Sequence, residues 1–195
     1  LGGKGANLCE MTQIGLNVPP GFVITTAACL AYLEEQRLPG ALMDDVRAHV
    51  AQLERKTGKS FGSATHPLLV SVRSGSAMSM PGMMDTILNL GLNPATLKGL
   101  MAQTGNERFA WDAYRRFVQL FGKIAMGIPD EAFDDAMAEV KRKHGAVHDV
   151  ELGAGALEEL ADLPIRGRGN RIFRLGELAE VRPEEDSRGF FFPAA

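Results

Sequence analysis

The sequence is poor in cysteine, has no long apolar run and carries no excess of positive charge. Its two cysteines, Cys9 and Cys29, form no Cys-x-x-Cys motif, which favours reduced thiols over a disulfide framework. No apolar stretch approaches the ~20 residues that span a bilayer. The 21 basic and 24 acidic side chains give a net charge of -3, which excludes a global positive field. We therefore expect a cytoplasmic protein without nucleic-acid or membrane partners, in which any anion site is local.

Histidine is also scarce, and its distribution argues against a metal site. Two of the four histidines, His144 and His148, flank Gly145, which is expected to break the helix that shared metal ligation would need. The acidic residues between 130 and 139 open an expected helix, where the helix dipole favours negative charge. We therefore predict no metal ligands in this chain.

Residues 1–92 predict an α/β (α+β) fold in which helices flank a small sheet. Apolar spacing and stop signals predict a helix between the Gly2-Gly3 turn and Gly15, and others over residues 26–36 and 40–56. Runs of β-branched and aromatic or aliphatic residues predict strands over residues 22–25 and 68–73.

Residues 93–163 predict a helical subdomain, and residues 164–195 differ from both parts. Start signals at Pro94, Asn106 and Pro129 predict three helices, and a weaker one is expected over residues 156–163. The last stretch crowds arginines and ends near Phe190-Phe191-Phe192, so we interpret it as an atypical, non-native tail from a frameshift or cloning boundary. Leu1, directly before a glycine cluster, indicates that the chain begins inside a longer sequence.

Two segments combine glycine, hydroxyl groups and positive charge in a way that suits phosphate. In residues 2–7 glycines allow close backbone approach, the following helix offers amides at its N-terminus, and Lys4 adds a charge. In residues 71–86 a strand delivers Arg73, a bidentate donor, into a loop with serines and Thr86. The alternatives are a structural glycine turn with a surface lysine, and a surface ion pair at Arg73 beside methionines that fill a core.

A third segment, residues 106–117, places arginines beside an aromatic helix face. Arg108 and Asp112 are spaced i and i+4, which favours a solvated ion pair. Arg115 and Arg116 point in different directions, so at most one of them can face a given site. Taken alone, this pattern favours a structural role for these arginines.

The order and spacing of these segments resemble the pyruvate, phosphate dikinase family. The resemblance rests on five stretches, at residues 1–8, 18–22, 70–75, 80–91 and 104–117. The loop at Ser79–Thr86 distinguishes the chain from phosphoenolpyruvate synthases, which share the glycine-lysine opening. The resemblance implies part of an ATP-grasp nucleotide-binding domain, which in the family works with a carrier-histidine domain and a pyruvate-binding barrel domain.

The resemblance also implies roles for particular residues. Lys4 and Arg73 would contact the ATP phosphates, with Arg73 also acting in catalysis. The loop with Gly82, Asp85 and Thr86 would fold over the phosphates, and Arg116 would bind orthophosphate. Mg²⁺ would accompany ATP, with its protein ligands outside this chain. The family often has an arginine where this sequence has Ala77, and its pattern is lost after residue 163.

The function of the chain has three competing interpretations. In the first, it serves within a dikinase that converts ATP, pyruvate and phosphate into phosphoenolpyruvate, AMP and diphosphate through a phosphohistidine. In the second, it is a non-catalytic nucleotide-binding module, or part of a phosphoenolpyruvate synthase relative. In the third, residues 94–163 form a helical interaction segment, and unpaired strand edges favour a homodimer. The isolated segment is expected to be inactive as an enzyme.

Overall fold

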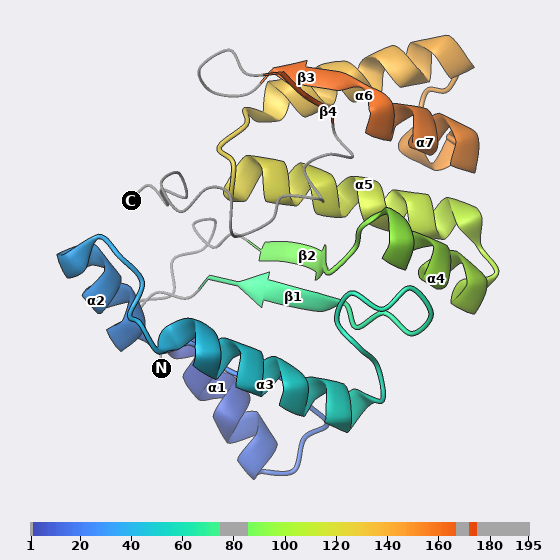
Figure 1. Ribbon diagram of the computed structural model, residues 1–195. Helices are drawn as coiled ribbons and strands as arrows, with labels where there is room; N and C mark the ends of the chain where they lie inside the picture. Colours follow the sequence, from blue (N-terminus) through green and yellow to red (C-terminus); the bar gives the residue numbers. More distant parts are fainter. Residues whose placement is uncertain (1, 75–85, 167–171, 175–195) are drawn as a thin grey trace. The chain divides into compact units, whose positions relative to one another are not determined.

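The computed structural model describes residues 2–74, 86–166 and 172–174, and this part of the chain is mostly helical (Figure 1). The chain divides into two compact units, one formed by Leu1–Phe61 with Arg73–Thr86 and the other by Gly62–Val72 with Ile87–Ala195. None of the described helices has the length and apolar character that a membrane crossing needs. The predicted division at residues 92 and 163 stays a prediction.

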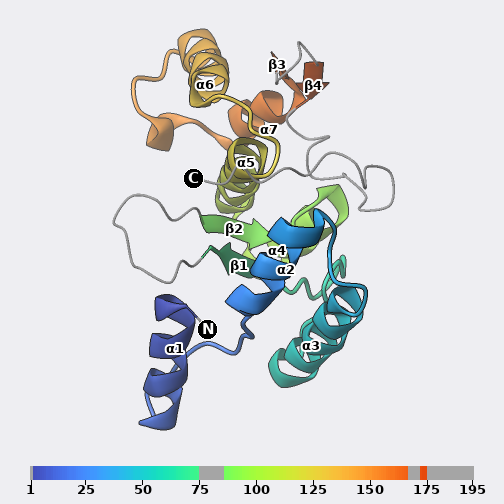
Figure 2. The same ribbon diagram turned by 90° about the vertical axis from the view of Figure 1, so that its left-hand side faces the viewer.

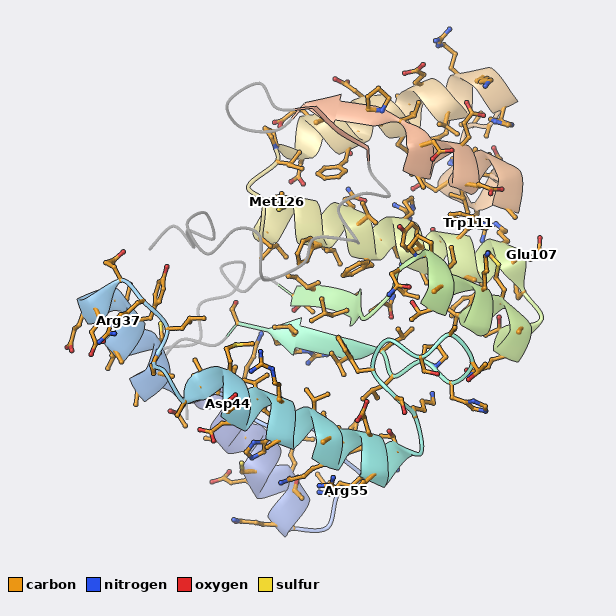
Figure 3. All side chains as sticks on the ribbon, viewed as in Figure 1. Arg37, Asp44, Arg55, Glu107, Trp111 and Met126 are labelled. Atoms are coloured by element: carbon orange, nitrogen blue, oxygen red, sulfur yellow. The ribbon has the colours of Figure 1, made fainter. Side chains whose placement is uncertain are left out.

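The first unit contains three helices, α1 (Gly3–Gln13), α2 (Thr26–Glu35) and α3 (Leu42–Thr57). These bounds confirm the three helices that apolar spacing and stop signals predict for this region. In α3, Asp44 lies in the first turn and Arg55 in the last, so both charges complement the helix dipole (Figure 3). Gly58 then ends the helix with a φ of 67°, a conformation that glycine adopts without strain.

The strand predicted over residues 22–25 is not formed. These residues, all of them described, run without strand pairing between α1 and α2. Phe22, Val23 and Ile24 are exposed instead of packed in a sheet. The prediction was wrong because such a composition favours a strand only where a neighbouring strand completes the backbone hydrogen bonds.

Few side chains are buried in the first unit. Its buried helical residues are Gly5 and Leu53. Many of its large apolar side chains are exposed, among them Leu8, Met11, Ile14, Leu16, Leu30, Leu33 and Leu38. A largely apolar groove of about 390 Å³ lies between residues 22–25, α2 and α3. Apolar burial therefore contributes little to the stability of this unit.

The strands are short and occur in pairs. β1 (Val70–Arg73) pairs with β2 (Thr86–Leu90), and their arrows run in opposite directions in Figure 1. β3 (Pro164–Arg166) pairs antiparallel with β4 (Ile172–Arg174). β1 falls within the predicted strand, whereas the other three are not predicted from the sequence. The described chain is thus more helical than the expected α/β fold, and the origin of residues 164–195 stays a prediction.

The second unit is built mainly from helices, three of which begin at the start signals that the sequence shows. They are α4 (Pro94–Thr104), α5 (Glu107–Ile124), α6 (Asp130–His144), the short 3-10 helix η1 (Asp149–Glu151) and α7 (Ala154–Asp162). Asn93 Oδ1 accepts from the amide of Thr96 at 2.9 Å, and Thr96 Oγ1 accepts from the amide of Asn93 at 2.7 Å. This capping box fixes the start of α4, as Asn106 does for α5.

Helix α5 lies between α4 and α7 and forms the centre of the core (Figures 1 and 2). Its buried residues are Gly122 and five side-chain positions, Ala110, Ala113, Tyr114, Phe117 and Val118. They pack with residues from the surrounding elements, including Leu92, Leu97, Ile128, Phe133, Val140, Leu152 and Leu157. Phe109, at the start of the helix, is 50% exposed.

Helix α4 approaches the loop of residues 62–67 so closely that position 99 has no room for a side chain. A Cβ built on Gly99 would overlap the carbonyl oxygen of Ala64 and lie 2.8 Å from the carbonyl carbon. One turn further, Gln103 Nε2 donates to the carbonyl of Thr65 at 2.7 Å. The two contacts fix this loop to α4 shortly before β1 begins.

We expect Gly99→Ala to lower the free energy of unfolding by about 1–3 kcal/mol, because the added methyl group must displace backbone atoms. Gly155→Ala is the matched control. Gly155 lies in the first turn of α7, and a Cβ there meets nothing within 4 Å. Alanine at that position should be neutral or stabilise by up to about 1 kcal/mol. Urea titration followed by circular dichroism measures both variants, and equal effects would contradict the close approach.

Candidate functional site

Lys4 lies in the first turn of α1, at a helix N-terminus without a side-chain cap. Gly2 takes a positive φ of 70° at the N-cap, and the first helical hydrogen bond joins the Ala6 amide to the Gly2 carbonyl at 3.0 Å. The amides of residues 3–5 come before the first amide that donates a helical hydrogen bond. The first turn carries no acidic side chain. Lys4 itself is half-buried. Backbone amides, the helix dipole and a lysine charge together suit an anion such as phosphate.

Arg73 and Thr86 lie at the ends of paired strands. Arg73 is the exposed last residue of β1, and Thr86 is the half-buried first residue of β2. Gly82 and Asp85, which the sequence predicts to act with them, lie outside the described residues, as does Ala77. Lys4, Arg73 and Thr86 belong to the first unit. Their phosphate-binding roles stay predictions.

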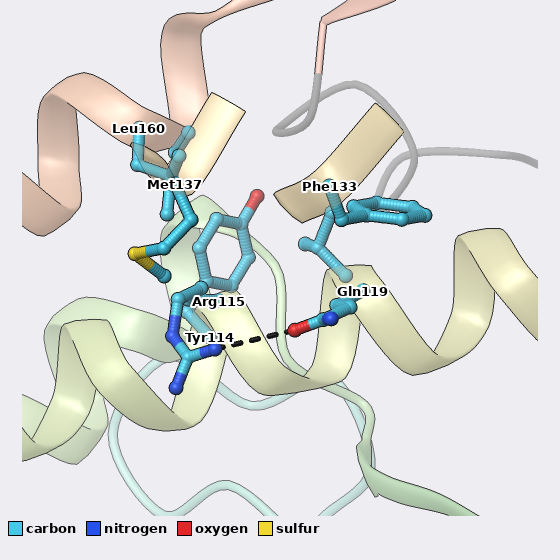
Figure 4. A pocket seen from close by; sticks show the side chains of 8 residues that line it. Tyr114, Arg115, Gln119, Phe133, Met137 and Leu160 are labelled. Carbon is cyan, nitrogen blue, oxygen red and sulfur yellow. Dashed lines mark hydrogen bonds between the residues drawn. The ribbon is translucent and has the colours of Figure 1, made fainter. Parts of the chain in front are cut away.

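Arg116, in the second unit, ends a chain of polar contacts along α5. Gln119 Oε1 accepts from Arg115 Nη1 at 3.2 Å (Figure 4). Arg115 also donates to Asp112 Oδ1, from Nη2 at 2.8 Å and from Nε at 3.2 Å. The other carboxylate oxygen, Oδ2, lies 2.9 Å from Arg116 Nε. One carboxylate therefore contacts two arginines.

The two arginines differ in exposure. The side chains of Arg115 and Asp112 are 13% and 19% exposed, whereas that of Arg116 is 58% exposed. Two guanidinium groups and one carboxylate leave a net positive charge on this face of α5. Of the two arginines, Arg116 is the one that a ligand from solvent can reach.

The ion pair predicted between Arg108 and Asp112 is wrong. Arg108 donates from Nε to the carbonyl of Leu152 at 2.9 Å and from Nη2 to the carbonyl of Asp149 at 3.1 Å. A planar guanidinium can serve two carbonyls at once, here those of the first residue of η1 and of the residue that follows η1. The residues that do contact Asp112 follow it by three and four positions. That spacing, Asp112 with Arg115 and Arg116, is the signal that sequence reasoning missed.

A small cavity adjoins Arg115 (Figure 4). Its volume is about 20 Å³, and Arg115 and Gln119 line it together with Tyr114, Val118, Phe133, Met137, Leu160 and Ala161. A space of this size holds about one water molecule. The cavity is therefore too small for a nucleotide, and Arg115 serves the internal packing and hydrogen bonding of the second unit.

Positive charge on α5 and α6 lowers the pKa of a nearby carboxyl group. The hydrogen bond from Lys141, whose Nζ lies 2.7 Å from Asp149 Oδ1, is the main reason that the pKa of Asp149 is lowered. Burial opposes this effect, and the charges of Lys141, Arg115 and Arg116 add to it. The field of the two arginines thus extends beyond Asp112.

In the three described ranges, no group of three or more His, Cys, Asp or Glu side chains is placed to hold a metal ion. His144 instead lies at the contact between α6 and α7. Its Nε2 lies 3.0 Å from Glu159 Oε2, and Lys143 Nζ lies 2.6 Å from the other carboxylate oxygen.

Comparison with known proteins relates most of the chain to one enzyme. Residues 1–42 match the family described as pyruvate phosphate dikinase, AMP/ATP-binding domain. The pyruvate, phosphate dikinase of Entamoeba histolytica is 54% identical over 167 residues, which cover 85% of this chain and 19% of that protein. The corresponding enzyme of Giardia intestinalis is 52% identical over 162 residues, covering 83% and 18%. That of Rhizobium meliloti is 48% identical over 176 residues, covering 84% and 20%.

The chain thus spans about a fifth of the length of these curated relatives. The match confirms the family resemblance that the motifs indicate. The match covers one segment of these enzymes. In this chain it extends well beyond residues 1–42, the part that matches the nucleotide-binding family.

We expect Lys141→Met to raise the pKa of Asp149 towards its ordinary value of 3.8, because the main cause of the lowering is removed. A lowered pKa means that Asp149 stabilises the fold above about pH 4 and that this contribution is lost as the pH falls through the folded-state pKa. Since the pair is partly exposed, the contribution stays below about 1 kcal/mol. Carboxyl ¹³C NMR titration measures the pKa.

Lys143→Met is the matched control for this titration. It removes the contact of Lys143 with Glu159, the main cause of the lowered pKa of that residue, and leaves Lys141 in place. It should raise the pKa of Glu159 and leave that of Asp149 unchanged. An Asp149 pKa that does not respond to Lys141→Met would contradict the assignment.

Proposed function

Since this chain is homologous to a segment of pyruvate, phosphate dikinase within its AMP/ATP-binding domain, we propose that it holds the phosphate part of ATP in a longer enzyme of that class. The proposed reaction converts ATP, pyruvate and phosphate into phosphoenolpyruvate, AMP and diphosphate. It passes through a phosphohistidine in a carrier domain, and a further domain binds pyruvate. The ATP-grasp architecture and a cytoplasmic location belong to the same proposal.

The observation that carries the proposal is the position of Lys4. It lies in the part of the chain that matches the nucleotide-binding family, and in the first turn of a helix that has neither a side-chain cap nor an acidic residue there. A phosphate group at this position would accept from backbone amides and gain the lysine charge. Lysine at such a site acts as a mobile point charge.

We assign Arg73 to the ATP phosphates and to catalysis. Phosphoryl transfer spreads negative charge over the oxygens of the transferred group, and a permanent cation stabilises that charge. Arg73 is exposed at the end of β1, and Thr86 at the start of β2 adds a hydroxyl donor. Gly82 and Asp85 complete the proposed phosphate loop. Arg116, exposed on α5, is proposed to bind orthophosphate through its bidentate donors.

Mg²⁺ enters the proposal as the companion of ATP. When bound, the ion neutralises charge on the phosphate oxygens. We assign none of the described residues to the metal. The ligands, the carrier histidine and the pyruvate site are proposed to belong to other parts of the full-length protein.

We expect Arg73→Ala to weaken ATP binding by about 10- to 100-fold, because a charge-assisted hydrogen bond contributes about 1.5–3 kcal/mol. Arg47→Ala is the matched control, since Arg47 is an exposed arginine of the same unit that pairs with Asp44. It removes the same charge and should leave the affinity nearly unchanged. Calorimetric titration with ATP and Mg²⁺ measures both. Tight binding that survives Arg73→Ala would remove Arg73 from the site.

The isolated chain should form no phosphoenolpyruvate when it is supplied with ATP, pyruvate, phosphate and Mg²⁺. The reason is that the proposed carrier histidine and pyruvate site lie elsewhere. Phosphorus NMR of the reaction mixture checks this directly, with a full-length relative as the positive control. Sustained turnover by the chain alone would refute the proposed division of labour.

A further inference from the structure

The contacts of Asp112 go beyond those of a surface ion pair, and we propose that it is a positioning residue for Arg116. Its carboxylate would hold the guanidinium of Arg116 in the orientation that binds phosphate. The inference rests on the proposed role of Arg116 as a phosphate ligand, and it adds a residue to which the family motif as described above gives no role.

The geometry gives Asp112 a fixed direction. Arg115 holds Oδ1 with two donors, Nη2 at 2.8 Å and Nε at 3.2 Å, and is itself tied to Gln119 at 3.2 Å. These contacts leave the carboxylate little freedom to rotate. Its second oxygen, Oδ2, therefore presents a defined acceptor to Arg116 Nε at 2.9 Å.

Burial separates this arrangement from ordinary surface pairs. The pair of Arg47 with Asp44 joins two mostly exposed side chains, and each loses conformational freedom when the pair forms. Asp112 is 19% exposed and already ordered by Arg115, so Arg116 alone remains to be oriented. Ordering it before a ligand arrives lowers the entropic cost of binding.

Arg116 keeps donors for a ligand while it contacts Asp112. A guanidinium carries five N–H groups in one plane, more than one carboxylate oxygen can accept. The side chain is 58% exposed, so solvent and small anions can reach it. A phosphate with several acceptor oxygens fits such a planar donor set.

A purely electrostatic role of Asp112 and a positioning role predict opposite changes in phosphate affinity when its negative charge is removed. If its negative charge merely weakens the local field, then removing that charge strengthens phosphate binding. If it positions Arg116, then removing it weakens binding although the site becomes more positive. The sign of the change therefore decides between the two roles.

The test is a titration of the full chain with inorganic phosphate, followed by calorimetry, in four variants. We expect Asp112→Asn to weaken phosphate binding by about 2- to 10-fold. Asp112→Glu, which keeps the carboxylate, should restore the affinity to within about 2-fold by the same argument. Asp130→Asn is the charge-matched control, because it removes a carboxylate that pairs with Lys123 in the same unit. It should not weaken binding, whereas Arg116→Ala should.

A second readout follows Arg116 without any ligand. In ¹⁵N-labelled chain, the Nε–H signals of Arg115 and Arg116 should exchange slowly with water, and Asp112→Asn should accelerate exchange at both. Asp130→Asn should not. Circular dichroism establishes that each variant is folded. Unchanged exchange of Arg116 in Asp112→Asn would overturn the proposal.

The possible outcomes distinguish this inference from the function on which it rests. If Arg116→Ala weakens phosphate binding but Asp112→Asn leaves it equal or tighter, then Asp112 is not a positioning residue and the role of Arg116 survives. If the unmodified chain binds no phosphate, or is insensitive to Arg116→Ala, then both the proposed role of Arg116 and this inference are contradicted.

Discussion

The second unit depends on how α5 divides its surface between apolar packing and charge. The small residues Ala110 and Ala113 lie on its buried face, where α4 and α7 pack against it. Because α4 and α7 cover these sides of α5, the charged side chains of α5 are confined to the uncovered strip of its surface. Residues three and four apart are neighbours on such a strip. The shared use of Asp112 by Arg115 and Arg116 follows from that confinement.

The candidate phosphate ligands come from two differently packed units. Lys4 and Arg73 belong to the unit that buries few side chains, and Arg116 belongs to the unit with the core around α5. Regions with few buried apolar contacts open readily, and ligand-binding segments are commonly drawn from them. A ligand that binds only the folded form of such a unit would stabilise it by an amount set by the concentration and affinity of the ligand.

Local signals predict the helices, and contacts between distant residues cause the errors. Asn106 and Gly58 act within one turn of the helices that they start or end, so the sequence displays their effect. A strand at residues 22–25 would need a partner, which composition does not reveal. The site shows the same division. Motifs indicate the phosphate-binding candidates, whereas the bonds of Arg108 to the carbonyls of Asp149 and Leu152 depend on tertiary packing.

The contact of Gly99 with Ala64 joins segments that are distant in sequence. The loop of residues 62–67 cannot leave α4 without breaking the hydrogen bond between Gln103 and Thr65. Detaching the loop from α4 therefore costs this hydrogen bond and the close packing against Gly99. The strand that ends at Arg73 thus follows a loop that contacts α4 at two points one helical turn apart.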